Sequence, residues 1–329
     1  MESFARPLLA WYQVNKRDLP WRRDVTPYRV WVSEIMLQQT RIEAARGYFE
    51  RFTAAFPTVE ALAAAREDAV LKLWEGLGYY SRARNLHKCA RTVVKEYGGA
   101  FPRTPGELKK LPGIGEYTAG AIASIAFGER AAAVDGNVCR VLTRLERCGE
   151  PVSESLKTRY RAVLADMIPS GEAGEFTSAL MELGETVCLP GQPRCGECPL
   201  AALCRARAAG DEERYPVLKP KKDRRVEERR VLLLICGHTV GVRRRPDRGL
   251  LAGLWELPND TEPDPPPEAE PCGETIHRFS HVEWRMRGYV LRCARPLPGY
   301  TWVTREERQA LAIPSAFKYY VNVLEEMGL

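Results

Sequence analysis

The sequence has no long apolar run, no large excess of one charge and, at its start, no stretch with the layout of a signal peptide. No hydrophobic stretch approaches the ~18 residues that a membrane helix needs, so a spanning protein is excluded. Residues 1–11 lack the layout of a signal peptide, and we therefore expect a cytoplasmic protein. The net charge of +6 permits a polyanionic partner without requiring one. Because that compartment is reducing, the ten cysteines do not indicate a disulfide framework.

The length of the chain indicates two domains, and the first is expected to be all helical. The 329 residues exceed a prior of ~150 residues per domain. Apolar residues recur at helical spacing over residues 58–74. Residues 104–107 form a capping box that predicts a helix running to Leu111. Small apolar residues at 117–127 predict a buried helix, so residues 1–205 are predicted to form one all-α domain.

A basic segment follows the helical domain. Residues 205–230 hold ten Lys or Arg and six Asp or Glu, with little to bury. We interpret residues 206–230 as a linker.

Residues 231–329 predict a small α/β domain. Short apolar runs, alternating patterns and turn residues mark strands in this part of the chain. The expected strands are 231–236, 239–244 and one from Val282, the expected loop is 260–274, and the expected helices follow Thr304 and cover 315–326.

Four cysteines have the spacing of a metal site. Cys188, Cys195, Cys198 and Cys204 are separated by six, two and five residues, with Pro and Gly in the gaps. Four thiolates in such a loop can hold an iron–sulfur cluster or a zinc ion. Zinc sites usually have two close pairs of ligands and this segment has one, so the spacing favours iron–sulfur. Four unrelated core cysteines are the alternative, and the lack of a core-like apolar pattern argues against it.

A tight turn at residues 111–115 separates two predicted helices. Gly113 and Gly115 let the backbone approach a ligand closely, and the N–H groups at the start of the second helix suit a phosphate. Such a hairpin can hold a DNA backbone without reading sequence. A plain turn between helices is the alternative on this motif alone.

Two carboxylates are candidate functional groups. The simplest interpretation of Asp135 is a helix N-cap, since it precedes Gly-Asn-Val. Glu34 is one of 43 acidic residues, and an acid on a helix is normally just solvated. Its neighbours Trp31, Ile35 and Met36 are apolar, however, and burial among them would raise the pKa of the carboxyl group.

Together these motifs resemble the helix–hairpin–helix DNA glycosylases related to endonuclease III, and within them the MutY-type adenine glycosylases. The resemblance covers nearly the whole chain. It implies a multi-domain protein, with an all-α glycosylase domain holding one 4Fe–4S cluster at the four cysteines and a small α/β, Nudix-like C-terminal domain. The matching segments are the cysteine spacing and residues 32–40, 76–80, 111–115 and 134–138.

The resemblance implies an enzyme that removes adenine paired with 8-oxoguanine or guanine in double-stranded DNA. Glu34 matches the general acid that protonates the adenine. Asp135 matches the carboxylate that stabilises the cation-like sugar, electrostatically or through a transient covalent bond. Asn137 and Tyr117 match residues that orient and support this pair. Relatives that also cut the strand carry an imine-forming Lys where this chain has Tyr117, so a monofunctional enzyme is implied.

Further DNA contacts are implied in the same way. Gln39 and Tyr79 match residues that insert near the lesion, and Trp21 and Arg22 match residues near the flipped adenine. At Ser178 the family often has a longer polar side chain, so this chain departs from the pattern there, and a water could substitute.

The C-terminal segment resembles the Nudix-like domain of MutY. Residues 249–258 match its strand-and-turn segment. Residues 259–272 are Pro-rich where true Nudix hydrolases have a Glu-rich, magnesium-binding helix, so hydrolysis of nucleoside triphosphates is not expected. Phe279, Ser280 and His281 match the loop that recognises 8-oxoguanine, although on residues alone they could be an ordinary strand entry.

The prediction is a monomeric, monofunctional adenine glycosylase of a bacterial, nucleoid-associated type. One rival is a thymine- or uracil-mismatch glycosylase, because some of these also have Tyr at the position of Tyr117; the Phe-Ser-His motif argues against it. The other is a non-catalytic iron–sulfur DNA-binding or redox-sensing module. The presence of both Glu34 and Asp135 argues against that rival, because a pure binder needs neither.

Overall fold

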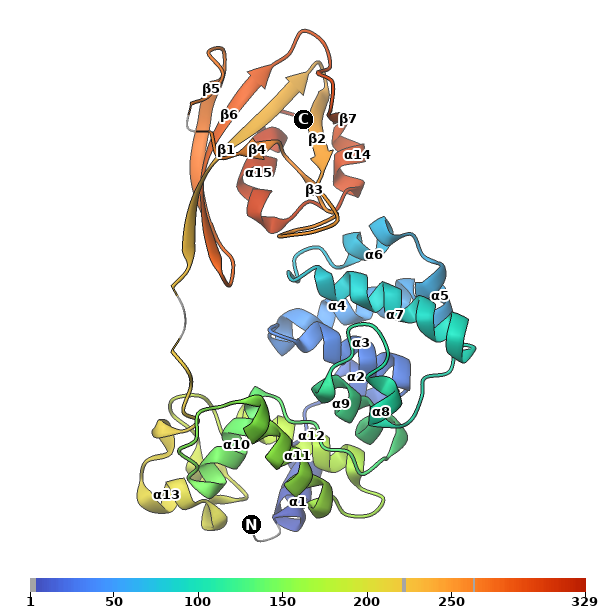
Figure 1. The fold of residues 1–329 in the computed structure, drawn as a ribbon, viewed down its shortest axis with the longest axis vertical. Coiled ribbons are helices and arrows are strands. Elements are labelled where there is room, and N and C mark those ends of the chain that lie inside the picture. The colour runs from blue at the N-terminus through green and yellow to red at the C-terminus, as the bar shows by residue number, and fades with distance from the viewer. Residues whose placement is uncertain (1–3, 221–222, 263) are drawn as a thin grey trace. The chain divides into compact units, whose positions relative to one another are not determined.

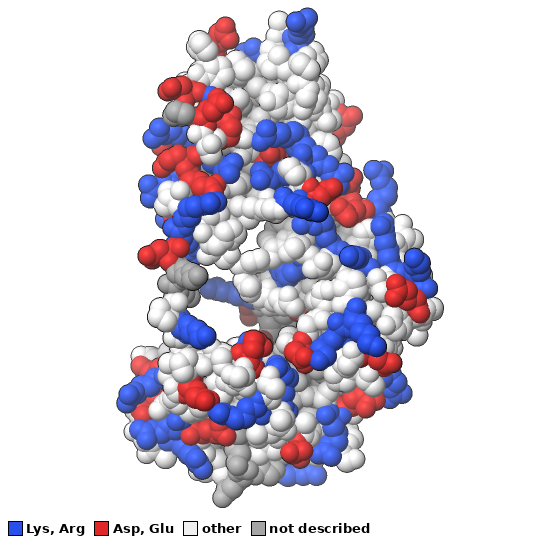
Figure 2. Space-filling view, viewed as in Figure 1, with Lys and Arg blue, Asp and Glu red and all other residues white. Residues whose placement is uncertain are grey.

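The computed structural model describes residues 4–220, 223–262 and 264–329, and the chain divides into two compact units (Figure 1). The first comprises Met1–Ala64 and Asn85–Pro220, and the second Ala65–Arg84 and Lys221–Leu329. Lys and Arg are interspersed with Asp and Glu on the face seen in Figure 2, in keeping with the small net charge. No helix in the described ranges is both long and apolar enough to cross a membrane.

The first unit is helical, as predicted. Its α-helices are α1 (Ala5–Asn15), α2 (Pro20–Arg23), α3 (Pro27–Leu37), α4 (Ile42–Ala55), α5 (Val59–Ala64), α8 (Pro105–Leu108), α9 (Glu116–Phe127), α10 (Gly136–Glu146), α11 (Glu154–Met167), α12 (Ala173–Thr186) and α13 (Arg205–Ala209). Short 3-10 turns lie at Cys195–Glu197, Ala201–Leu203 and Glu212–Arg214. Helix α6 (Glu67–Leu73) belongs to the second unit, and α7 (Ser81–Tyr97) crosses the boundary between them.

The buried helix predicted at 117–127 is α9, and it lies at the centre of the helical unit. Helices α3 and α12 both pack against it. Small residues let neighbouring segments approach α9 closely. A Cβ on Gly120 of α9 would lie 2.6 Å from the carbonyl oxygen of Ala132, which precedes α10, and one on Gly174 of α12 would lie 3.1 Å from Cα of Ile125 in α9. Helices α3, α9 and α12 therefore carry their side chains into one shared region.

Two helical predictions were too long. The segment 58–74 forms two helices, α5 and α6, because Arg66 between them is extended. The hydroxyl of Thr104 caps α8 as predicted, accepting from the backbone N–H of Glu107 at 3.3 Å, but α8 ends at Leu108 and not at Leu111. Pro112 explains the early end, since it cannot donate a helical hydrogen bond and disfavours helical backbone at the residue before it.

The second unit contains a mixed sheet in the order β3-β2-β1-β6-β5. Its central strands β1 and β6 are parallel, and their neighbours are antiparallel. The strands are β1 (Arg225–Cys236), β2 (Thr239–Arg244), β3 (Trp255–Glu256), β4 (Asn259–Asp260), β5 (Glu270–Arg278), β6 (Val282–Arg292) and β7 (Thr301–Val303).

Much of the segment predicted as a linker, 206–230, is ordered structure. It contains most of α13 and the first six residues of β1, which starts at Arg225. The charged start of β1 is stable as a strand because its side chains are paired: Glu227 binds Arg229 at 2.8 Å and accepts from the indole of Trp284 at 3.0 Å. The predicted loop 260–274 likewise ends early, because β5 begins at Glu270.

Alternation along β6 builds the core of the second unit, as predicted from Val282 onward. Trp284 and Met286 are buried, together with Phe317 and Tyr320. The phenol of Tyr320 donates to the carbonyl oxygen of Met286 at 3.0 Å. Helix α14 (Arg305–Ala310) has the predicted capping box, and the predicted helix 315–326 is a 3-10 turn followed by α15 (Lys318–Glu326).

Candidate active site

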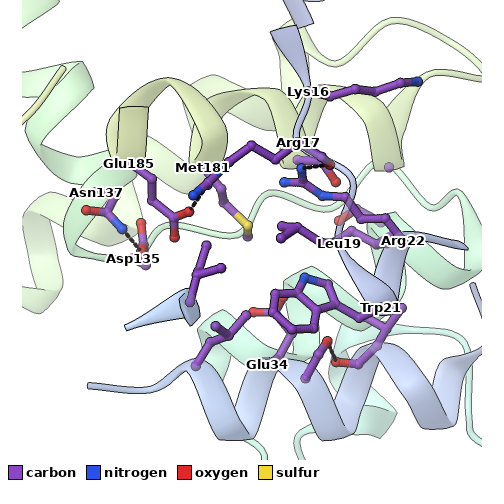
Figure 3. A pocket seen from close by; sticks show the side chains of 18 of the residues that line it. Lys16, Arg17, Leu19, Trp21, Arg22, Glu34, Asp135, Asn137, Met181 and Glu185 are labelled. Atoms are coloured by element: carbon purple, nitrogen blue, oxygen red, sulfur yellow. Dashed lines mark hydrogen bonds and ion pairs between the residues drawn. The ribbon is translucent and has the colours of Figure 1, made fainter. Parts of the chain in front are cut away.

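One cavity in the helical unit collects all four of the predicted catalytic residues. Its volume is about 1270 Å³, and side chains from α1, α2, α3, α9, α10 and α12 line it (Figure 3). Eight predicted site residues lie on its walls: Trp21, Arg22, Glu34, Gln39, Tyr117, Asp135, Asn137 and Ser178.

Glu34 is buried at the cavity wall, which confirms the burial predicted from its apolar neighbours. Its exposed fraction is 6%, and the phenol of Tyr117 donates a hydrogen bond to its Oε2 at 2.6 Å. Burial raises the pKa of Glu34 to about 7; the hydrogen bond from Tyr117 opposes this rise, and the charge of Asp135 adds to it. A carboxyl group with such a pKa can carry a proton near neutral pH and act as an acid.

Asp135 is the N-cap of α10, as its sequence setting predicted. Its Oδ1 accepts from the backbone N–H of Val138 at 2.7 Å, and its Oδ2 accepts from Nδ2 of Asn137 at 3.1 Å. Burial raises the pKa of Asp135, while these hydrogen bonds and the charge of Arg140 lower it. The same carboxylate lines the cavity, so capping does not exclude a chemical role.

Arg140 connects Asn137 to the first of the four spaced cysteines. Its Nη2 donates to Oδ1 of Asn137 at 2.9 Å and to the carbonyl oxygen of Gly184 at 2.8 Å, and its Nε donates to the carbonyl oxygen of Cys188 at 2.8 Å. Gly184 permits this approach, since a Cβ there would lie 2.8 Å from Cβ of Asn137. The orientation of Asn137 is therefore fixed by the segment that carries Cys188.

An ion-pair network that the sequence did not reveal forms another wall. Glu182 is fully buried and binds Nε of Arg17 at 2.6 Å and Nη2 of Arg22 at 2.8 Å. Burial alone would raise the pKa of Glu182, but the hydrogen bonds from Arg17 and Arg22 hold this pKa below its usual range. Arg17 also binds Glu185, a cavity residue, at 2.5 Å. These partners are more than 150 positions apart in sequence, so no local pattern indicates them.

Ser178, where the chain departs from the family pattern, lies on the cavity wall. Tyr12 lines the same cavity. The guanidinium of Arg22 lies 5.6 Å from the centre of the Tyr12 ring. The aromatic side chain of Tyr12 thus occupies the wall beside the short side chain of Ser178.

Gln39 and Tyr79 share an unusual backbone conformation but lie in different units. Both have positive φ, 59° at Gln39 and 47° at Tyr79. Gln39 lines the cavity, whereas Tyr79 is in the second unit and 45% exposed. Left-handed backbone at bulky residues is uncommon, and it is often found at functional sites.

The predicted hairpin at 111–115 is a tight turn. Gly113 has φ of 76°, and a Cβ there would lie 2.7 Å from Cβ of Asn85, so only glycine fits. Gly115 is the N-cap of α9, and a Cβ on it would meet nothing within 4 Å. No side chain caps the start of α9. Its first backbone N–H groups can therefore serve an anion.

The segment 279–281 forms the turn between β5 and β6. Phe279 is half-buried, with its ring 4.9 Å from that of Trp284 and 4.5 Å from that of His277. Ser280 and His281 are exposed, and Oγ of Ser280 lies 3.3 Å from Nδ1 of His281. Phe279 therefore anchors a turn that presents two polar side chains to solvent.

All four spaced cysteines line one small cavity, together with Arg144 and Arg207. Nη1 of Arg144 lies 3.3 Å from Sγ of Cys188. No three His, Cys, Asp or Glu side chains in the described part of the chain converge on a single metal ion. Four thiols around a shared space, with arginines beside them, form a donor set that suits a thiolate-bound metal group such as an iron–sulfur cluster.

Comparison with known proteins decides the family. Residues 32–164 match the HhH-GPD superfamily of base excision DNA repair proteins, and residues 230–323 match the NUDIX domain. The adenine DNA glycosylase of Homo sapiens is 36% identical over 98% of this chain and 74% of its own length, and that of Rattus norvegicus is 36% identical over 98% and 78%. The chain belongs to the adenine DNA glycosylase family.

Solved structures of DNA glycosylases and related enzymes have the same fold as the helical part of this chain. A thermostable thymine-DNA glycosylase is similar with a TM-score of 0.56 and 28% identity, over 63% of this chain and 95% of that one. Endonuclease III in a non-covalent DNA complex has a TM-score of 0.53 and 26% identity, over 62% and 94%. The present adenine glycosylase family member thus has a DNA glycosylase fold followed by a Nudix-like domain. Between β4 and β5 its described residues form no helix, as the prolines there predicted.

Proposed function

We propose that this protein is a monofunctional glycosylase that excises adenine paired with 8-oxoguanine, or with guanine, in double-stranded DNA. The observation that carries the proposal is the buried Glu34, bonded to Tyr117 in the same cavity as Asp135. The relatives named adenine DNA glycosylase, which match over 98% of the chain, support the choice of adenine.

In the proposed mechanism, the adenine enters the cavity as a flipped base, because its glycosidic bond is out of reach inside the duplex. Glu34 donates its proton to a ring nitrogen of the adenine. The N-glycosidic bond then breaks, and its electron pair leaves with the base. The carboxylate of Asp135, held by Val138 and Asn137, stabilises the cation-like sugar. Water adds to the sugar and loses a proton, which leaves free adenine and an abasic site.

Tyr117 supports the monofunctional assignment. Strand cleavage by the related bifunctional chemistry needs an amine that forms an imine with the sugar. The side chain at this position is a phenol, and its hydroxyl group is committed to Glu34 at 2.6 Å. The abasic strand should therefore stay intact until alkali cleaves it.

The turn at 279–281 supports recognition of the opposite base. Ser280 and His281 are exposed at its tip and supply a hydroxyl group and an imidazole that can bond a base edge. Phe279 is held by Trp284 and can keep the turn in place. We assign 8-oxoguanine selectivity to this turn.

We also propose that Cys188, Cys195, Cys198 and Cys204 bind one 4Fe–4S cluster. Base excision transfers no electron, so the cluster supplies structural chemistry: it ties the loop together through its thiolates. Through Cys188 and Arg140 this loop also supports Asn137.

A thymine-mismatch glycosylase is the second candidate, because the structure of a thermostable thymine-DNA glycosylase matches the helical part. That match already covers 95% of the thymine glycosylase and only 63% of this chain. The Nudix-like part at 230–323 therefore favours adenine glycosylases, of which those of Homo sapiens and Rattus norvegicus match 98% of this chain.

The test is single-turnover cleavage of three labelled duplexes that differ only at one pair: adenine opposite 8-oxoguanine, adenine opposite guanine, and thymine opposite guanine. We expect the fastest excision of adenine opposite 8-oxoguanine and none of thymine. Excision of thymine would support the second candidate, and DNA binding without excision of either base would support a non-catalytic module.

A further inference from the structure

A third carboxylate, Glu185, lies in the cavity beside the two that the mechanism uses. It is in the last turn of α12, on the face that also carries Gly174, Ser178 and Met181 to the cavity wall. Figure 3 shows its carboxylate pointing into the cavity next to Asp135 and bonded to Arg17. Because nothing in its sequence setting distinguishes it, only the fold reveals its position.

The ion pair with Arg17 holds this carboxylate in place. Oε2 of Glu185 lies 2.5 Å from Nη2 of Arg17, and Arg17 is itself fixed by Nε and Nη2 contacts to Glu182 at 2.6 and 3.0 Å. Glu182 is shared between two arginines, since it also binds Arg22 at 2.8 Å. Glu185 is the carboxylate of this network that lies at the cavity wall.

We propose that Glu185 is a positioning residue for adenine excision, whose carboxylate, fixed by Arg17, places an additional negative charge in the cavity. This inference rests on the proposed function. It predicts that Glu185 acts on the reaction through Glu34 and Asp135, and not by holding the fold together.

The groups around Glu34 define what that charge does. Tyr117 on α9, Asp135 before α10, Glu185 on α12 and Arg22 on α2 line the same cavity as Glu34 and act on its pKa. The charges of Asp135 and Glu185 raise the pKa of Glu34, after the larger effect of burial, whereas Tyr117 and Arg22 lower it. Burial also raises the pKa of Glu185, while its hydrogen bond to Arg17 lowers it. In its ionised form Glu185 adds to the effect of burial in keeping the proton on Glu34, and the same charge favours a cation-like sugar.

The test compares three variants with the wild-type protein in single-turnover excision of adenine opposite 8-oxoguanine across pH 5.5–9. In Glu185→Gln the shape of the side chain and one accepting oxygen for Arg17 are kept, and the charge is lost. In Glu185→Asp the charge is kept on a shorter chain. Glu172→Gln is the matched control, because Glu172 starts the same helix, binds Arg6 and is not part of the cavity wall.

We expect the alkaline limb of the rate profile, where Glu34 loses its proton, to move to lower pH by roughly 0.5 to 1 unit in Glu185→Gln. The rate at pH 8 should fall about tenfold, because both proton donation and charge stabilisation weaken. Glu185→Asp should keep most of the wild-type limb, and Glu172→Gln all of it. Affinity for a duplex with a non-cleavable adenine analogue should not weaken in Glu185→Gln.

An alkaline limb that stays in place in Glu185→Gln overturns the inference, whatever the size of the rate loss. A limb that moves equally in Glu172→Gln also overturns it, since the shift would then not be specific to the cavity. If the wild-type protein releases no adenine, the proposed function itself fails, and that result is distinct from an unmoved limb in an active enzyme.

Discussion

The phenolic oxygen of Tyr117 lies 2.6 Å from Oε2 of Glu34, and its hydrogen bond favours the ionised form of a carboxyl group that burial otherwise keeps protonated. Burial prevails, since the pKa of Glu34 is raised to about 7. The pKa of the acid in the proposed mechanism is thus set near neutral pH by two opposing effects, burial and the hydrogen bond from Tyr117.

Removing the phenol should shift this balance. In Tyr117→Phe the hydrogen bond that lowers the pKa of Glu34 is lost, so the alkaline limb of the single-turnover profile should move to higher pH, by roughly 1 unit or less. Tyr28→Phe is the matched control, because Tyr28 lies on the helix that carries Glu34, α3, but its phenol donates to the carbonyl oxygen of Phe56. A limb that stays in place in Tyr117→Phe would refute the assigned contact.

Glu34→Gln should lower the rate of excision and, at alkaline pH, raise the stability of the protein. The amide cannot donate the proton, and excision should fall roughly 10²- to 10⁴-fold while DNA binding remains.

The same substitution should change the pH dependence of stability. The pKa of Glu34 in the folded protein is about 7, above its ordinary value of 4.5, so the free energy of unfolding of the wild type falls as the pH rises between these two values. At higher pH the ionised Glu34 lowers that free energy by about 3 kcal/mol. Thermal unfolding should therefore show the variant more stable than wild type at pH 8, with a smaller difference at pH 5. Equal stability differences at both pH values would contradict this.

The turn between β5 and β6 should control selectivity for the opposite base. Ser280→Ala combined with His281→Ala removes two exposed polar groups and should leave the fold intact. The ratio of excision rates opposite 8-oxoguanine and opposite guanine should fall by about fivefold or more, as expected for lost hydrogen bonds. An unchanged ratio would reject the recognition role of this turn.

The four cysteines should bind iron. Purified protein should be brown and contain ~4 iron atoms per chain, as four thiolates around one cluster require. Cys198→Ser should lower the iron content and the thermal stability together. A colourless wild-type protein that contains zinc would contradict the assignment.

Local patterns predicted those parts of the fold that local chemistry determines. Asp135 caps α10 and Thr304 forms the capping box of α14, as their sequence settings indicated. Alternation predicted β6, and the apolar setting of Glu34 predicted its burial. In each case the determining neighbours lie within a few positions along the chain.

Contacts between distant segments could not be predicted in this way. Arg17, Glu182 and Glu185 meet across about half of the chain, and each is ordinary in its own segment. Arg140 joins Asn137 to Cys188 only because α10 and α12 pack closely at Gly184. The charged start of β1 resembled a linker because the strand that it pairs with, β6, lies far along the chain.

The most direct test of the central claim is the product analysis of one duplex with adenine opposite 8-oxoguanine. Released adenine and strand breaks are measured in the same sample, with and without alkali, for the wild-type protein and for Glu34→Gln. We predict one adenine released per abasic site in the wild type, breaks only after alkali, and formation of both products roughly 10²- to 10⁴-fold more slowly by Glu34→Gln. Strand breaks without alkali, or adenine release by Glu34→Gln at the wild-type rate, would contradict this prediction.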